Sequence, residues 1–193
     1  MAERGYGWEK LVSEMFCQEY WAERRMKTAI ARFHNVYGPN GTWDGGREKA
    51  PAALSRKVIE ALDTGKLEMD IWGDGSQTRS FMYIDDCVKG IDMIMHCEEL
   101  IATPINLGSS ELISINDLVS MIEEFAGVKL ERHYKLDAPQ GVAGRNSDNT
   151  FIQQVLGWEP DTPLREGMQK TYAWIQQQYA DRKAGKFVPA GVH

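Results

Sequence analysis

The chain has 193 residues, of which 42% are hydrophobic and 26% are charged, a composition typical of a soluble globular protein that buries a core. It carries 22 Lys and Arg residues against 28 Asp and Glu residues, and the formal net charge of −6 argues against a general binder of nucleic acid or anionic membranes. No apolar run approaches the roughly 18 residues that span a bilayer. The length predicts one domain or two small ones. Residues 1–10 do not resemble a signal peptide, which predicts a cytoplasmic protein.

The first half of the chain alternates between helix and strand patterns. Five large apolar residues at helical spacing predict that the chain opens on a helix: Trp8, Leu11, Val12, Met15 and Phe16. A β-branched and aromatic run predicts one buried strand over residues 28–37, and a Gly-rich segment follows over residues 38–46. Pro51 and the apolar residues after it predict a helix that ends at Gly65.

The second half continues this alternation. Short strands are predicted over residues 67–71 and 80–84, with the Gly73-Asp74-Gly75 turn between them presenting Arg79. The Asp85-Asp86 pair is predicted to cap a helix, and a strand follows over residues 104–107. Ser114 is predicted to cap a helix that ends at Gly127. Residues 130–136 could form a strand, and a last helix is predicted from residue 162 to residue 179, before a frayed tail.

Strands that alternate with helices predict an α/β protein. A nucleotide-binding sheet of this class normally begins with a strand, a Gly-rich turn and a helix, and no such unit precedes Trp8. The cysteines Cys17, Cys87 and Cys97 lack CxxC spacing and lie in helical patterns, which predicts buried thiols. No metal site is predicted, and His34 is expected to be a packed strand residue.

Tyr6 and Lys10 stand four residues apart at the start of the first predicted helix, so both side chains can project from one face. An ammonium group near a phenol stabilises the phenolate, which makes a tyrosine usable as a general base. A Tyr-x-x-x-Lys pair taken alone is more often an ordinary exposed helical pair, so its interpretation depends on other motifs.

Three motifs in the same order resemble those of the extended short-chain dehydrogenase/reductase family, which contains nucleotide-sugar epimerases and dehydratases. They are Tyr6-Gly7-Trp8-Glu9-Lys10, Arg32-Phe33-His34-Asn35-Val36-Tyr37-Gly38-Pro39 and Trp72-Gly73-Asp74-Gly75-Ser76-Gln77-Thr78-Arg79-Ser80-Phe81-Met82-Tyr83-Ile84-Asp85-Asp86. The resemblance extends from Tyr6 to about Gln178, which is nearly the whole chain.

This resemblance implies a fold, a cofactor and two catalytic residues. The fold would be the C-terminal part of a Rossmann-like doubly wound parallel sheet, interleaved with a smaller α/β substrate-binding lobe. Residues 1–39 would end the NAD-binding Rossmann domain. Residues 40–193 would form mainly the substrate-binding lobe, with a strand and helix near residues 85–110 returning to the Rossmann sheet. NAD is the implied cofactor, with Tyr6 and Lys10 in contact with it and acting in catalysis.

Within the family, residues 41–53 and 144–149 most closely resemble the branch that epimerises GDP-mannose. That resemblance implies transient oxidation at C4, proton exchange at C3 and C5, and re-reduction, with Lys49 as one acid/base. Lys49 also has a physical argument, because it lies just before a predicted helix N-terminus, where the dipole disfavours a cation by roughly 0.3–1 kcal/mol. Together with Arg47, this dipole favours the neutral amine, although a solvated surface lysine is the simpler interpretation of the residue alone.

Cationic side chains concentrate around Lys49 in an otherwise acidic chain. Arg47, Lys49, Arg56 and Lys57 are predicted to form one cluster, and the guanidinium groups of Arg79 and Arg145 suit bidentate diphosphate contacts. The substrate implied by the resemblance is GDP-mannose or a related nucleotide-sugar, and its candidate binding residues are Asn35, Arg47, Lys49, Lys57, Arg79 and Arg145.

The family's Gly-rich NAD loop and a catalytic cysteine belong upstream of Tyr6, and Cys17, Cys87 and Cys97 do not match that cysteine. We therefore expect an N-terminally truncated form that works as a homodimer or with a separate N-terminal half. Two alternatives stay open, namely a non-catalytic nucleotide-sugar-binding or dimerisation fragment, and another nucleotide-sugar 4-epimerase or 4,6-dehydratase. Neither nucleic acid nor a membrane is an expected partner.

Overall fold

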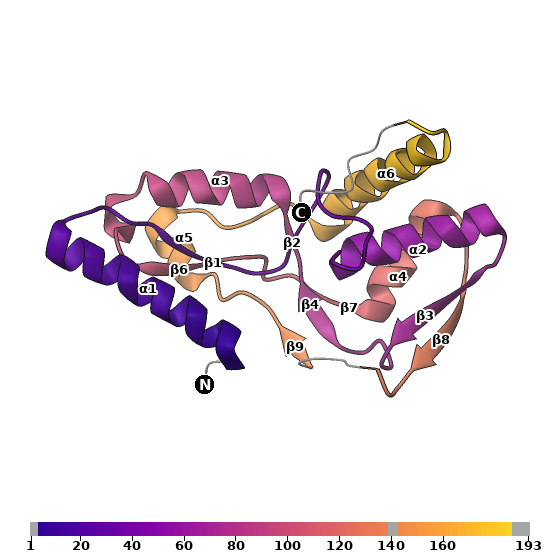
Figure 1. Cartoon of the computed structure of the whole chain (residues 1–193), viewed down its shortest axis with the longest axis horizontal. Coiled ribbons are helices and arrows are strands. Elements are labelled where there is room, and N and C mark those ends of the chain that lie inside the picture. The colour runs from indigo at the N-terminus through magenta and orange to yellow at the C-terminus, as the bar shows by residue number, and fades with distance from the viewer. Residues whose placement is uncertain (1–3, 139–142, 187–193) are drawn as a thin grey trace.

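The computed structural model describes residues 4–138 and 143–186. Its helices lie in two groups (Figure 1). The first group contains α1 (Arg4–Arg24), α3 (Ile84–Met95) and α5 (Thr150–Leu156), with the short 3₁₀ helix η1 (Glu98–Leu100) after α3. The second group contains α2 (Ala50–Thr64), α4 (Ile115–Ala126) and α6 (Leu164–Lys183). None of the helices within the described ranges is long and apolar enough to cross a membrane.

The strands form short ladders. Three pairs are parallel: β1 (Ile30–Phe33) with β6 (Pro104–Leu107), β2 (Val36–Tyr37) with β5 (Met82–Tyr83), and β3 (Glu68–Trp72) with β8 (Glu131–Lys135). The central strand β4 (Thr78–Ser80) pairs antiparallel with β7 (Leu112–Ser114) and parallel with β9 (Gly144–Arg145). The predicted α/β class is confirmed, and in the described part of the chain its strands form separate ladders instead of one wide sheet.

Two hydrophobic cores hold these groups together. The larger core packs α2, α4 and α6 together and against β3, and its fully buried side chains include Val58, Ile71, Leu118, Ile122, Met168 and Ile175. The smaller core packs α3 and α5 against β6, and its members are Met82, Cys87, Ile94, Leu100, Ile105, Leu107 and Ile152. The β2–β5 ladder contributes to both cores, with Tyr83 in the larger core and Met82 in the smaller one. The ladder formed by β4, β7 and β9 lies between the two groups of helices (Figure 1).

The ends of the long helices follow from local sequence chemistry. Gly65 and Gly127 end α2 and α4 with φ values of 71° and 64°, the left-handed conformation that glycine adopts without strain. The Ser114 hydroxyl accepts a 3.0 Å hydrogen bond from the Asp117 backbone N–H, which confirms the predicted cap of α4.

Some predicted boundaries are wrong because tertiary contacts interrupt the strands. The predicted strand over residues 28–37 breaks into β1 and β2 at His34 and Asn35. The Asn35 carbonyl accepts a 2.8 Å hydrogen bond from the Met82 N–H, so the chain leaves β6 and joins β5. The predicted strand over residues 80–84 also divides, and α3 already begins at Ile84. Tyr83 is therefore the N-cap residue, and the Asp85-Asp86 pair lies in the first turn instead of capping the helix.

Other features of the fold differ from the expectations or were not predicted. Helix α5 and the strands β7 and β9 are too short to show a periodic pattern of their own. Cys87 is buried as predicted, whereas Cys17 and Cys97 are only half-buried, and all three thiols are free.

The first helix is the least buried element of its group. Its large apolar side chains are mostly exposed, including Tyr6 at 72% and Trp8, Leu11, Met15, Phe16 and Tyr20 at 47–55%. Helix α1 is joined to the strand region by the Thr28 hydroxyl, which donates to the Cys17 carbonyl, and by an ion pair between Arg32 and Glu14. The helical spacing is confirmed, but the residues that the structure describes leave the apolar surface of α1 largely exposed.

We predict that Gly167→Ala destabilises the protein by about 1–3 kcal/mol, as overpacked core sites do. An added Cβ would lie 2.8 Å from a ring carbon of Tyr83 and would also overlap the Tyr37 hydroxyl. Gly5→Ala in α1 is the matched control, because its Cβ would meet no atom within contact distance. Chemical denaturation of both variants measures the effect, and equal stability of the two would contradict the tight packing of α6 on β2 and β5.

Candidate active site

A groove of about 1440 Å³ lies between the start of α1, the strand β1, the helix α3 and the strand β9. Its lining combines polar and apolar side chains, among them Tyr6, Lys10, Arg32, Phe33, Ile91 and Arg145. The groove is therefore built by residues that lie far apart in the sequence, and it includes three of the predicted site residues.

Tyr6 and Lys10 lie one helical turn apart in α1 and both line this groove. The Lys10 ammonium nitrogen is 5.1 Å from the centroid of the Tyr6 ring and 3.5 Å from a carboxylate oxygen of Glu9. A cation at this distance over an aromatic ring is attracted to its π face. The geometry predicted from the four-residue spacing is thus present, with the Tyr6 side chain open to a ligand.

An ion pair that the sequence did not reveal connects α1 to β1 within the same groove. Arg32 Nε and Nη2 donate to the two carboxylate oxygens of Glu14 at 2.8 and 2.6 Å. The hydrogen bond from Arg32 lowers the pKa of Glu14, and the same bond raises the pKa of Arg32. The two residues are 18 positions apart, so no local pattern could have paired them, although Arg32 belongs to a recognised motif.

Arg79 and Arg145 are directly opposite each other on the parallel strands β4 and β9. The guanidinium of Arg79 donates a 2.7 Å hydrogen bond to the Thr78 carbonyl. Like charges opposite each other on neighbouring strands are destabilising unless an anion offsets them. The structure therefore brings together two residues that the sequence had placed 66 positions apart, at one edge of the central ladder.

His34 lies close to this arginine pair. Burial lowers the pKa of His34, and the positive charge of Arg145 lowers it further. Its backbone N–H donates to the Leu107 carbonyl at 3.0 Å, and Gly108 leaves room for its side chain. His34 is thus packed and half-buried, as the sequence predicted, but it lies between β1 and β2 and not within a strand.

Three predicted cationic site residues lie in the second group of helices. Arg47 and Lys49 are exposed in the loop before α2, and Lys49 is the N-cap residue of that helix. The Lys57 ammonium donates to the Asp70 carbonyl at 3.3 Å and lines a separate cavity of about 450 Å³. These three side chains do not line the groove that contains Tyr6, so the structure does not bring Lys49 and Tyr6 into one cavity.

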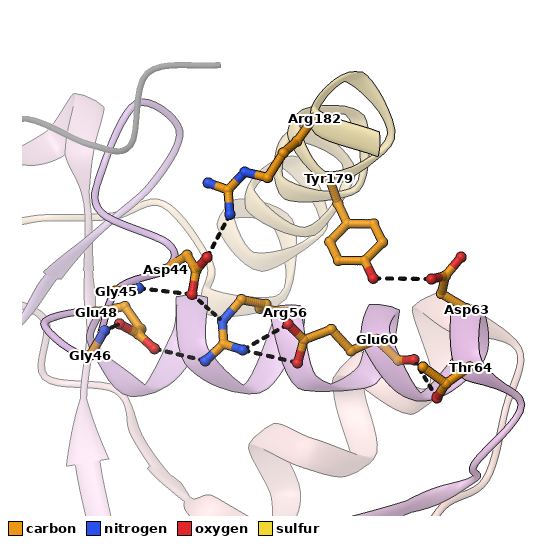
Figure 2. Close-up of polar contacts among 10 residues, drawn as sticks. All are labelled: Asp44, Gly45, Gly46, Glu48, Arg56, Glu60, Asp63, Thr64, Tyr179 and Arg182. Atoms are coloured by element: carbon orange, nitrogen blue, oxygen red, sulfur yellow. Dashed lines mark hydrogen bonds and ion pairs between the residues drawn. The ribbon is translucent and has the colours of Figure 1, made fainter. Parts of the chain in front are cut away.

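Arg56 does not belong to a free cationic cluster, which corrects the prediction from the sequence. Its guanidinium contacts the carboxylates of Asp44, Glu48 and Glu60, as Figure 2 shows. The positive charge of Arg56 is therefore fully compensated within the protein. The pairing with Glu60 follows i,i+4 spacing, a signal that the sequence offered.

Asn35, a predicted substrate-binding residue, holds the chain between two strands. Its side-chain nitrogen donates to the Ser80 carbonyl at 3.2 Å, and its backbone carbonyl accepts from Met82. The side-chain nitrogen of Asn35 is thus hydrogen-bonded within the protein, and its side-chain oxygen is the atom that could contact a ligand.

A sequence model of the NAD dependent epimerase/dehydratase family matches residues 2–108. This span is more than half of the chain. The chain belongs to the NAD dependent epimerase/dehydratase family. Membership accounts for the order of the three motifs that run from Tyr6 to Asp86.

Curated relatives in this family are similar over nearly all of the chain. GDP-mannose 3,5-epimerase from Arabidopsis thaliana is 45% identical over 179 residues, which are 93% of this chain and 46% of the relative. GDP-mannose 3,5-epimerase 1 from Oryza sativa subsp. indica is 44% identical over 178 residues, which are 92% of this chain and 45% of the relative. The chain thus spans about half the length of these curated relatives.

Solved structures of the family share the fold. UDP-glucose 4-epimerase from Thermotoga maritima, solved with UDP-glucose, matches with a TM-score of 0.80 and 27% identity. The match covers 90% of this chain and 54% of the epimerase chain. UDP-glucuronic acid 4-epimerase from Bacillus cereus, solved with NAD and a UDP-sugar derivative, has a TM-score of 0.73 at 30% identity over 90% of this chain and 53% of its own. The chain therefore shares part of the Rossmann-type α/β fold of these epimerases, about half of each solved chain, as the sequence predicted.

We predict that Glu14→Gln loosens α1 and speeds hydrogen exchange of its amides. Because Arg32 is half exposed, the loss in stability should stay below about 1 kcal/mol. The pKa of Glu14 is lower in the folded protein, so its contribution is present above the pKa of the unfolded chain. It is lost as the pH falls from about 5 towards 3, and this dependence should vanish in the variant.

Glu19→Gln is the matched control, because Glu19 is exposed on the same helix. Hydrogen exchange followed by mass spectrometry compares the variants at pH 7 and pH 3. Equal exchange of α1 in the Glu14 and Glu19 variants would show that the Arg32 pair does not hold this helix.

Proposed function

We propose that this chain is part of an NAD-dependent nucleotide-sugar epimerase that acts as GDP-mannose 3,5-epimerase does. The observation that carries the proposal is a single groove lined by both the Tyr6 and Lys10 pair and Arg145. A general base and a cation suited to a diphosphate can thus act on one ligand. The 45% and 44% identity to GDP-mannose 3,5-epimerases supports the choice of this activity within the family.

NAD fits the residues at the start of α1. The groove has a volume of about 1440 Å³ and is lined by Tyr6 and Lys10, and the Lys10 ammonium would donate to the hydroxyl groups of the ribose. When bound, NAD would supply the acceptor and then the donor of a hydride at the sugar C4. Lys10 would orient the cofactor next to Tyr6, whose ring centroid lies 5.1 Å from the Lys10 ammonium nitrogen.

Tyr6 would take the proton of the C4 hydroxyl as a general base and later return it. Oxidation at C4 gives a ketone, which acidifies the protons at C3 and C5. Lys49 would move one of these protons, with a cysteine of the whole protein acting on the opposite face. Lys49 stands at the N-cap of α2 and is exposed, so its amine is accessible to a ligand at the start of that helix.

The substrate in this proposal is GDP-mannose or a related nucleotide-sugar. The cross-strand pair of Arg79 and Arg145 would bind the diphosphate, because an anion between two arginines relieves their repulsion. Asn35, Arg47 and Lys57 would contribute further contacts. A nucleotide-sugar is an extended ligand, so it can contact residues on both sides of the central ladder, including Lys49.

The partner in this proposal is a second copy of the chain. Helix α1 exposes the apolar side chains of Leu11, Met15 and Phe16 at 47–55%, and an apolar surface of this kind favours burial against another protein. A separate N-terminal half would be the other candidate to cover it. Light scattering of the purified chain distinguishes the two, since a homodimer forms from the chain alone.

We predict that incubation of the whole protein, which contains this chain, with NAD and GDP-mannose in deuterated water introduces deuterium at C3 and C5 of the sugar. The label arises because the protons at these positions exchange with solvent in the 4-keto form. Mass spectrometry and NMR locate the label. Label absent from C3 and C5 while C4 inverts would indicate a 4-epimerase, and binding without any turnover would indicate a non-catalytic module.

We predict that Tyr6→Phe reduces turnover by at least about 100-fold, the typical contribution of a general base, while leaving GDP-mannose binding intact. The substitution removes only the hydroxyl group from an exposed ring. Tyr20→Phe is the matched control, because Tyr20 is exposed on the same helix and does not line the groove. Turnover that is unchanged in the Tyr6 variant would remove Tyr6 from the mechanism.

A further inference from the structure

The Arg56 guanidinium binds three carboxylates around the start of α2. Nη2 is 2.9 Å from Glu48, Nη1 is 2.8 Å from Glu60, and Nε is 3.5 Å from Asp44 (Figure 2). Only 17% of the Arg56 side chain and 6% of the Glu48 side chain are exposed. Contacts among groups this well buried are screened less by solvent than those of surface pairs.

Two of these carboxylates hold the loop that precedes Lys49. The loop contains Gly45 and Gly46, whose φ values of 98° and 83° are ones that glycine adopts without strain. Asp44 accepts a 2.8 Å hydrogen bond from the Gly45 N–H, and Glu48 accepts a 2.7 Å bond from the Gly46 N–H. Arg56 therefore holds both side chains that order this double glycine.

The last helix attaches to the same loop. Arg182 of α6 lies 2.5 Å from Asp44 (Figure 2). Its guanidinium carbon also lies 4.1 Å from the ring centroid of Trp43, a side chain that is 1% exposed. Burial raises the pKa of Asp44, but hydrogen bonds from Arg182 and Gly45 outweigh it and leave that pKa lowered. The loop is thus held between α2 and α6.

Glu48 is the residue immediately before Lys49, so the contacts of its carboxylate affect the electrostatic environment of the Lys49 amine. Burial raises the pKa of Glu48, but hydrogen bonds from the backbone and from Arg56 outweigh it, so the pKa is lowered and the carboxylate stays charged. This charge is shared between Arg56 and the Gly46 N–H. Within the described residues, Lys49 makes no ion pair with Glu48 or with any other acid.

We propose that Arg56 is a positioning residue that fixes the loop before Lys49 and keeps the Glu48 carboxylate away from the Lys49 amine. Without Arg56, the Glu48 carboxylate would keep only its hydrogen bonds to the backbone, among them the bond from the Gly46 N–H. Lys49 and Arg47 are its neighbours in the sequence. A carboxylate released there stabilises the protonated amine, which cannot accept a proton. This role rests on the proposed function of Lys49 as an acid/base, and it extends that function to a residue that touches no substrate.

The test measures the reactivity of the Lys49 amine in the full chain by competitive labelling with trace acetic anhydride and peptide mass spectrometry. Lys66, exposed after the other end of α2, is the internal reference. We expect Arg56→Met to slow labelling of Lys49 about threefold relative to Lys66, a change in the range of exposed charge pairs. Adding Glu48→Gln to this variant should restore the rate, because the released charge is then absent.

The matched control is Arg165→Met, which removes an arginine paired with Glu124 elsewhere in the second group. It should leave the labelling of Lys49 unchanged. Should Arg56→Met fail to fold, Arg56→Lys keeps the charge but cannot bind Glu48 and Glu60 with one planar group, and it should slow labelling to a smaller extent.

Unchanged labelling in the Arg56 variants would overturn the proposal, and so would a double variant that labels as slowly as Arg56→Met alone. The labelling needs neither NAD nor sugar. If Lys49 responds as expected but GDP-mannose is not epimerised, the proposed function fails while the role of Arg56 stands.

Discussion

The pairing of β4 on both sides determines where the charged groups of the candidate site lie. This strand has three residues, and it binds β7 on one side and β9 on the other. Through β7 it is joined to α4 and the larger core, and through β9 it brings Arg145 opposite Arg79. Without this ladder the two hydrophobic cores would be connected mainly by β2 and β5, and the arginine pair would not form.

Two groups of charged residues, one around Arg56 and one formed by Arg79 and Arg145, differ in kind. Arg56 is largely buried and forms ion pairs with three acids, so its charge is neutralised within the protein and these contacts order a loop. At Arg79 and Arg145 two cations are side by side at an edge, where an anionic ligand lowers their repulsion.

Sequence reasoning succeeded where structure depends on neighbours along the chain. The ends of α2 and α4 at Gly65 and Gly127 and the cap at Ser114 follow from single residues, and the spacing of Tyr6 and Lys10 follows from one turn of helix. It failed where structure depends on distant partners. The break at Asn35 requires contacts with residues 80 and 82, and the place of Arg56 depends on a loop and on the last helix.

The central claim is that this chain contains the diphosphate site of a nucleotide-sugar enzyme, and a double-mutant cycle tests it most directly. Calorimetric titration with GDP-mannose would compare the unaltered chain with Arg79→Met, Arg145→Met and the double variant. We expect each single substitution to weaken binding about tenfold or more, as hydrogen bonds to charged groups do, and the two effects not to add independently. Binding that is equally tight in all four proteins would contradict the claim.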